Sequence, residues 1–235
     1  MIQKQEAILK AQLLSFRDRV DRANATVSRM LEFCQKPYIG FSTGKDSTAV
    51  VDMVLRQRPD TAVVYLDSPG CALPESLAVL DIYETRGVNL VRWPVKDFLE
   101  IYREHDFNDP AWDMITMNEL VHKPVKELIK KHAFDGVFLG LRADESRVRT
   151  LSARSRGELF YRKTNSIMEC LPILWWRADD VWAYIHSRGL PYNKAYDKGI
   201  DRVCFWCGQT GRTIGRWATL KRHWPELYNR LAAEF

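Results

Sequence analysis

The strongest constraint on this chain is a short apolar run that leads directly into a polar, glycine-containing loop and then into a helix. Residues 38–41 (YIGF) are too few for a helix and predict a buried strand. Residues 42–47 read STGKDS, and residues 48–57 (TAVVDMVLRQ) predict a helix. A loop between a strand and a helix N terminus presents free backbone N–H groups and the positive end of the helix dipole. The sequence therefore predicts an anion-binding turn at residues 42–47, called the phosphate loop below.

The residue types in the phosphate loop suit contact with a phosphate group. Gly44 permits close backbone approach, and Lys45 brings a positive charge. Asp46 is unexpected beside an anion unless it holds Mg²⁺ or orients the turn. The hydroxyl groups that can donate to phosphate belong to Ser42, Thr43 and Ser47. The GxxxxGK(S/T) pattern is absent. The alternative of a merely polar helix cap is disfavoured by the preceding strand.

Apolar runs alternate with helix-like stretches along the rest of the chain. Further strands are expected at residues 62–66, 90–93 and 136–139 and at a short run, 171–174. Helices are expected at residues 3–34, 74–86, 118–132 and 178–188. This alternation predicts a doubly wound α/β fold, with a mostly parallel sheet and helices on both faces. We expect one domain over residues 1–235, with an N-terminal helix (1–35), an α/β core (36–188) and a C-terminal extension (189–235).

The hydropathy and charge of the chain bear on its location and partners. No stretch approaches the ~20 apolar residues of a membrane span, and residues 1–12 lack the apolar part of a secretory signal. We therefore expect a cytoplasmic protein that does not enter a membrane. The net charge is +5, and basic residues gather in RTIGRWATLKRHW at 212–224. A solvated surface and a nucleic-acid-binding surface are both open for this stretch, and a homo-oligomer is equally open.

The phosphate loop resembles the SxGKDS signature of the PP-loop ATP pyrophosphatase superfamily. Four later segments are similar to one branch of it, the phosphoadenosine phosphosulfate (PAPS) reductase family. These segments are LDSPGCALPES at 66–76, GLRADESRVR at 140–149, LPILWWRADDVWAYIHSRGLPYNKAYDKG at 171–199 and RVCFWCG at 202–208. Their order along the chain is the order of the family. In the third segment, Trp175, Trp176 and Trp182 are expected to pack in the core, with base stacking as the alternative.

The resemblance implies an adenine nucleotide α-hydrolase-like fold that binds ATP and Mg²⁺, and it assigns roles to particular residues. The implied catalytic residues are Lys45, Asp46 and Arg142. The implied nucleotide-binding residues are Ser42, Thr43, Gly44, Lys45, Asp46, Ser47, Asp67, Gly140 and Arg142. The implied substrate-side residues are Cys71, Glu75, Arg147 and Arg149. The alternative for the arginines of 142–149 is simple pairing with Asp144 and Glu145.

Two departures from the reductases affect the expected chemistry. No cysteine follows Cys207 in this sequence, whereas the reductases carry a C-terminal cysteine that attacks sulfur. The phosphate loop also keeps the Lys and Asp that the resemblance associates with ATP cleavage. We therefore expect cleavage of ATP between its α and β phosphates, with adenylation of an unidentified acceptor and an open link to sulfur transfer. The alternatives are a sulfonucleotide reductase that uses Cys71 or the CxxC pair, and a nucleotide- or nucleic-acid-binding module without turnover.

Cys204 and Cys207 form a CxxC pair, which supplies two soft ligands at one place. An iron–sulfur cluster or zinc, a redox dithiol and a structural role all remain open for this pair. A cluster would need further thiolates, and the sequence offers Cys34, Cys71 and Cys170. No second CxxC or His pair completes a zinc site.

Overall fold

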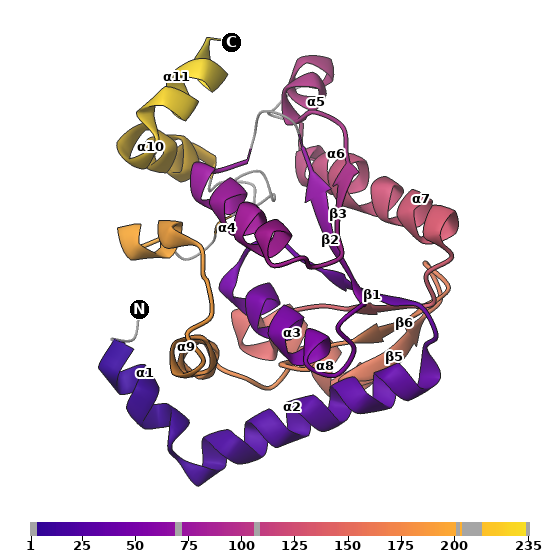
Figure 1. Cartoon of the computed structure of the whole chain (residues 1–235). Helices are drawn as coiled ribbons and strands as arrows, with labels where there is room; N and C mark the ends of the chain where they lie inside the picture. The colour runs from indigo at the N-terminus through magenta and orange to yellow at the C-terminus, as the bar shows by residue number, and fades with distance from the viewer. Residues whose placement is uncertain (1–3, 69–71, 106–108, 201–202, 204–212, 234–235) are drawn as a thin grey trace.

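The computed structural model describes residues 4–68, 72–105, 109–200, 203 and 213–233, and it has an α/β architecture built on a six-stranded sheet (Figure 1). The strand order is β3-β2-β1-β4-β6-β5. All neighbouring strands pair in parallel except β5, which runs antiparallel to β6 at the sheet edge. The strands are β1 (Pro37–Gly40), β2 (Ala62–Asp67), β3 (Leu90–Pro94), β4 (Gly136–Phe138), β5 (Leu159–Arg162) and β6 (Ile167–Cys170).

Helices cover both faces of this sheet. The longer ones are α1 (Lys4–Ala11), α2 (Leu14–Phe33), α3 (Lys45–Leu55), α4 (Pro74–Thr85), α7 (Lys123–His132), α8 (Arg147–Arg156), α9 (Ala178–Ser187), α10 (Thr213–His223) and α11 (Pro225–Ala232). The shorter ones are α5 (Phe98–Glu104), α6 (Trp112–Met117), the π-helical turn η1 (Asn118–His122) and the 3₁₀ turns η2 (Ala143–Glu145) and η3 (Lys194–Lys198). Across the described ranges, no helix is both long and apolar enough to cross a membrane.

The two faces of the sheet bury two apolar clusters, as the period of two along each strand requires. Ile39 and Phe138 point into the larger cluster, which lies on the side of α2, α3 and α9. Their strand neighbours Tyr38 and Val137 point into the smaller cluster, where Leu128 of α7 covers them. Because the central strands are buried on both faces, their sequences read as continuous apolar runs rather than alternating ones.

The parallel sheet and the helices on its two faces are confirmed. The prediction of one helix over residues 3–34 is wrong, because the chain breaks between α1 and α2, where Leu13 is extended (φ −67°, ψ 136°). The break lets α1 pack on α9, where Lys10 pairs with Asp180 at 2.8 Å, while α2 packs on α3 and β6. A hydrophobic pattern with helical spacing continues through such a bend, so the pattern did not reveal the break.

The edge of the sheet also differs from the sequence-based prediction. The run at 171–174 is a buried turn rather than a strand, with Leu174 N donating to Leu171 O at 3.1 Å. The strand lies just before it, in β6. The β5–β6 hairpin was not foreseen because each strand has only four residues, one of them charged, which is too short for a clear pattern. Trp176 and Trp182 are buried as expected, but Trp175 is 40% exposed, so the prediction of a core position for Trp175 is wrong.

Helix α4 offers a direct test of the larger cluster. Leu80 is fully buried, whereas Leu77 on the same helix is 39% exposed. We expect Leu80→Ala to lower the free energy of unfolding by about 2–5 kcal/mol, because it leaves a cavity in a packed core. Leu77→Ala is the matched control and should cost about 1 kcal/mol or less. Urea denaturation followed by circular dichroism measures both, and equal costs would contradict the described packing.

Candidate active site around the phosphate loop

The phosphate loop lies where the strand order changes direction. From β1 the chain moves outward through β2 to β3, and it then returns to the other side of β1 with β4. In open α/β sheets, ligands bind beyond the carboxyl ends of the strands at such a switch point. The phosphate loop follows β1, and the segment at 140–142 follows β4, so the fold brings these two predicted segments together.

Gly140 touches the backbone of the phosphate loop directly. A Cβ atom at this position would lie 2.6 Å from the carbonyl carbon of Asp46 and 2.6 Å from the backbone nitrogen of Ser47. No side chain fits at that distance, so only glycine allows the end of β4 to approach the N terminus of α3 this closely. The contact explains the glycine physically, and it positions Arg142 two residues later.

Asp46 is the centre of the charged part of the site. Its Oδ2 accepts from Lys45 Nζ at 2.9 Å, and its Oδ1 accepts from Arg142 Nε at 2.6 Å. A second carboxylate, Asp144, accepts from the guanidinium of Arg142 at 2.6 Å. Burial by itself would lower the pKa of Arg142, but the charges of Asp46 and Asp144 outweigh it and raise that pKa. The guanidinium therefore stays charged although only 5% of Arg142 is exposed.

The hydroxyl groups of the phosphate loop are partly used to hold its shape. Ser47 Oγ donates to Gly44 O at 2.9 Å and lies 3.3 Å from the backbone nitrogen of Ser42, which donates to it. Thr43 is fully buried and has a left-handed backbone (φ 59°), which is rare for a β-branched residue. Such strain persists only where the surroundings hold it in place and is common at functional sites.

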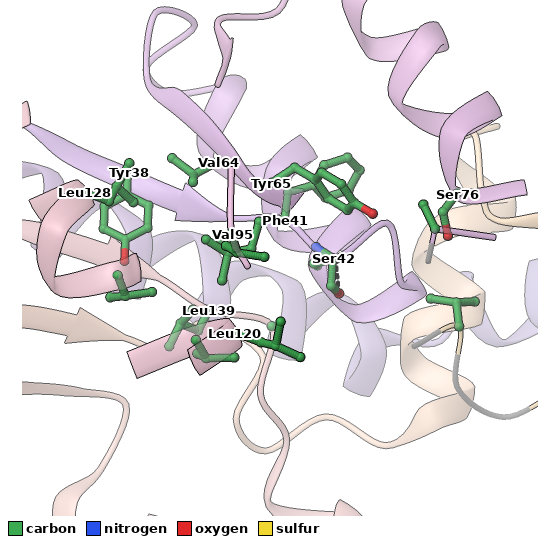
Figure 2. Close-up of a pocket in the computed structure, with 18 of the residues that line it drawn as sticks. Tyr38, Phe41, Ser42, Val64, Tyr65, Ser76, Val95, Leu120, Leu128 and Leu139 are labelled. Carbon is green, nitrogen blue, oxygen red and sulfur yellow. Dashed lines mark hydrogen bonds between the residues drawn. The ribbon is translucent and has the colours of Figure 1, made fainter. Parts of the chain in front are cut away.

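An apolar cavity of about 280 Å³ opens beside the phosphate loop (Figure 2). Ser42 and Ser47 line the cavity at the loop, and Tyr38 and Leu128 line its far end. The π-helical turn η1 brings Leu120 into its wall. Among the described residues that line it, none carries a charge. Figure 2 shows Ser42 along this largely apolar lining, between Tyr38 and Leu128 on one side and Ser76 on the other.

The other predicted site residues fall into different surroundings. Asp67 ends β2, the strand beside β1, at the same edge of the sheet. Glu75 does not face an open site: it accepts from Lys198 Nζ and from Trp224 Nε1 at 2.8 Å. Burial alone would raise the pKa of Glu75, but the hydrogen bond from Lys198 and that from Trp224 lower it. Glu75 therefore ties α4 to the C-terminal extension.

Two of the four arginines on α8, Arg147 and Arg149, were predicted to lie on the substrate side. Arg149 pairs with Glu145 and Arg142 pairs with Asp144, as the alternative for this segment expected, although Arg142 also pairs with Asp46. Arg147 is exposed. The basic stretch at 212–224 is likewise divided, because Leu220 and Trp224 are buried while Lys221 and Arg222 are exposed on α10. Trp224 is thus a core residue.

The cysteines are divided between the core and the undescribed segments. Cys71, Cys204 and Cys207 lie outside the described residues, so their predicted roles stay predictions. Cys34 and Cys170 are buried under α2, and Cys34 adjoins Gly136 at the amino end of β4, the edge opposite the phosphate loop. Within the described part of the chain, no three potential metal ligands lie together. Cys170 ends β6 at the carboxyl edge of the sheet, where its buried thiol lies 3.7 Å from Thr26 O of α2.

Sequence reasoning missed two residues that contact the phosphate loop, Asn193 and Tyr196. Asn193 Nδ2 lies 3.4 Å from Thr43 Oγ1, and Tyr196 Oη accepts from Lys45 N at 3.1 Å. Both belong to the segment LPYNKAYDKG, which the sequence pattern placed in the family motif without a role. An asparagine and a tyrosine flanked by turn residues were the only signal, and such residues are common in loops.

Gly140 provides the first test of the site. We expect Gly140→Ala to weaken ATP binding about tenfold or more, because its Cβ must displace the backbone of the phosphate loop by roughly 1 Å. Gly189→Ala is the matched control: it is also strained (φ 58°), but its Cβ meets nothing within 4 Å. Calorimetric titration with ATP compares the two variants. Equal affinities would show that the close approach does not shape the loop.

The core thiols provide a second test. Burial, followed by the charge of Asp135, raises the pKa of Cys34 to about 11. At pH 8 its thiolate is therefore about a hundredfold rarer than that of an ordinary cysteine, and alkylation should slow by at least that factor. Peptide mass spectrometry after iodoacetamide treatment, in native buffer and in urea, measures the rate at Cys34 separately. Fast native labelling would show that the thiol is accessible.

Comparison with known proteins agrees with this geometry. The family model for the phosphoadenosine phosphosulfate reductase domain matches residues 36–210. An uncharacterized protein of Methanocaldococcus jannaschii is 31% identical over 211 residues, 87% of this chain and 42% of that longer protein. The chain thus spans less than half the length of this relative. An adenosine 5′-phosphosulfate reductase of Halalkalibacterium halodurans is 25% identical over 194 residues, 77% of this chain and 80% of that one.

Two solved structures share the fold at low sequence identity. The PAPS reductase of Candida auris, in a phosphate complex, is 16% identical with a TM-score of 0.60, covering 77% of this chain and 86% of that one. The U34-tRNA thiolase NcsA of Methanococcus maripaludis, with its 4Fe–4S cluster, is 13% identical with a TM-score of 0.56. The match covers 92% of this chain and 77% of that one. The fold, the phosphate loop at the switch point and the family match lead to one assignment: the chain belongs to the phosphoadenosine phosphosulfate reductase family of PP-loop proteins.

Proposed function

We propose that this protein cleaves ATP between its α and β phosphates and transfers the adenylyl group to an oxygen of an acceptor. The observation that carries the proposal is the pairing of Lys45 and Arg142 on one carboxylate, Asp46, at the N terminus of α3. Two cations held side by side at a helix N terminus can bind an anion, because the positive end of the helix dipole adds to their charge.

The neutral cavity supports binding of the nucleoside part of ATP. Its volume of about 280 Å³ and its largely apolar walls suit a flat, uncharged base, and Ser42 and Ser47 line it at the phosphate loop. A base in this cavity places the attached phosphates at the phosphate loop. The division between an apolar pocket and a charged loop is what an adenine nucleotide requires, with one end apolar and the other anionic.

In the proposed step, an acceptor oxygen attacks the α phosphorus. The bond from that phosphorus to the oxygen bridging to the β phosphorus breaks, and pyrophosphate leaves with the electron pair. Lys45 and Arg142 release Asp46 and pair with phosphate oxygens instead. There they stabilise the negative charge that develops on the phosphate oxygens. Asp46 would then be free to hold Mg²⁺, which proteins usually bind through one or two carboxylates. Bound there, Mg²⁺ would supply further neutralisation of the phosphate charge.

The identity of the acceptor is a further part of the proposal. A sulfur-transfer role is supported by the shared fold of a tRNA thiolase and by the CxxC pair at Cys204 and Cys207. Val203, which precedes this pair in the sequence, would lie 3.7 Å from a Cβ on Gly44, so the chain passes the phosphate loop immediately before Cys204. We propose that the pair supplies thiol or cluster chemistry to the adenylated acceptor. The exposed Lys221 and Arg222 are compatible with a nucleic acid as that acceptor.

A second candidate function is thiol-dependent reduction of a sulfonucleotide. The 25% identity with an adenosine 5′-phosphosulfate reductase over most of both chains supports it. In that reaction a cysteine thiolate, from Cys71 or the CxxC pair, attacks sulfur and forms an S-sulfo-cysteine as the nucleotide leaves. A dithiol donor then releases sulfite. The reaction consumes no ATP, which separates it from the first candidate.

The decisive experiment incubates the anaerobically purified protein with α-labelled ATP and Mg²⁺, and separately with a sulfonucleotide and a dithiol. We expect AMP or an adenylated product together with pyrophosphate from the first mixture. Lys45→Ala and Arg142→Ala should each slow this reaction about a hundredfold or more, because each removes a cation from the developing charge. Arg154→Ala, at an exposed arginine on α8, is the matched control and should leave the rate unchanged.

Either of two results would contradict the proposal. Normal ATP cleavage by Lys45→Ala and by Arg142→Ala would show that the pair on Asp46 is not catalytic. Sulfite release from the sulfonucleotide, without pyrophosphate from ATP, would establish the second candidate in place of the first.

A further inference from the structure

We propose that Asn193 and Tyr196 are positioning residues for the phosphate loop. The Tyr196 hydroxyl accepts a hydrogen bond from the first amide of α3 and donates one to a bound phosphate. The inference rests on the proposed function, since it concerns the same loop. It goes beyond that function because it assigns phosphate recognition to a segment about 150 residues away in the sequence.

The first backbone amide of α3 does not face a ligand directly. Lys45 N donates to Tyr196 Oη at 3.1 Å, so the oxygen of the phenol accepts from the helix N terminus. Its own proton can then be donated onward to an acceptor in front of the loop. Because each hydrogen bond in such a chain polarises the next, the phenol becomes a stronger donor than an isolated hydroxyl. Tyr196 thus extends the positive end of the helix dipole.

The phenol is fixed in a protonated form and in one place. Tyr196 is 5% exposed, and burial raises its pKa, so the hydroxyl keeps its proton at neutral pH. The ring of Trp182 packs edge-on against it, with the ring centres 5.2 Å apart. A Cβ on Gly44 would lie 3.3 Å from the hydroxyl, so the hydroxyl sits against the bend of the phosphate loop.

Asn193 holds the strained residue of the same loop. Its side chain is fully buried, and its amide nitrogen lies 3.4 Å from Thr43 Oγ1 and 3.0 Å from Ser76 Oγ. Its amide oxygen accepts from Ala195 N at 3.0 Å, which fixes the orientation of the amide. One side chain therefore links the phosphate loop at Thr43 to α4 at Ser76. This link explains how a threonine is kept in a left-handed backbone conformation.

The test compares Tyr196→Phe with the wild-type protein. The phenylalanine keeps the ring packed on Trp182 and removes only the hydroxyl. We expect the affinity for ATP and for inorganic pyrophosphate to fall about tenfold to a hundredfold, as expected for loss of one hydrogen bond to a charged group. The affinity for adenosine, which has no phosphate, should stay within a factor of about two. Displacement of a fluorescent ATP analogue measures all three ligands.

The matched control is Tyr192→Phe, in the same segment, whose hydroxyl donates to Asp197 instead of contacting the loop. It should leave all three affinities unchanged. A thermal melt of each variant separates loss of binding from loss of folding. Equal falls for ATP and adenosine would assign Tyr196 a merely structural role and overturn the inference. Unchanged ATP affinity in Tyr196→Phe would overturn it too, while leaving the proposed function intact; a wild-type protein that binds neither ATP nor pyrophosphate would overturn both.

Discussion

The close approach of Gly140 to the N terminus of α3 is the contact on which the rest of the site depends. It joins two segments that follow different strands, β1 and β4, and it leaves no room for a side chain between their backbones. Because these strands are neighbours in a parallel sheet, their carboxyl ends meet at one edge. The chain that leaves β4 then carries Arg142 over the loop to Asp46. Without this contact, the two cations of the site would belong to separate surfaces.

Burying the charged side chains at the phosphate loop lowers the stability of the fold. Lys45 and Arg142 are nearly buried, and buried ions lose hydration that a single pairing does not fully replace. Asp46 offsets this cost by accepting from both cations, and Asp144 adds a second carboxylate at Arg142. A hydrophobic replacement would stabilise a purely structural protein equally well. Charges retained at a switch point beside a cavity are therefore more consistent with a binding site than with a structural one.

The apolar cavity and the charged loop act on different parts of a ligand, yet each depends on the other. A ligand that fills the cavity would exclude water from one side of the loop, and charges in a poorly hydrated place interact more strongly. The π-helical turn η1 helps to close this pocket with Leu120, and π-turns often occur at functional sites. The segment with Asn193 and Tyr196 closes the loop from the other side. The site is thus built from several stretches of chain that are separated in the sequence.

The sequence by itself determined the central parallel strands and the loop, because both depend on local patterns. A run of four apolar residues before STGKDS and a helix after it specify a strand–loop–helix unit wherever the chain goes next. The family motifs also indicated Arg142 and Gly140. What the tertiary structure decided is which side chains meet. Glu75 accepts hydrogen bonds from Lys198 and Trp224. Arg149 pairs with Glu145, and the Tyr196 hydroxyl accepts from Lys45 N. Contacts of this kind depend on how distant segments pack, and no local pattern of apolar and polar residues encodes that.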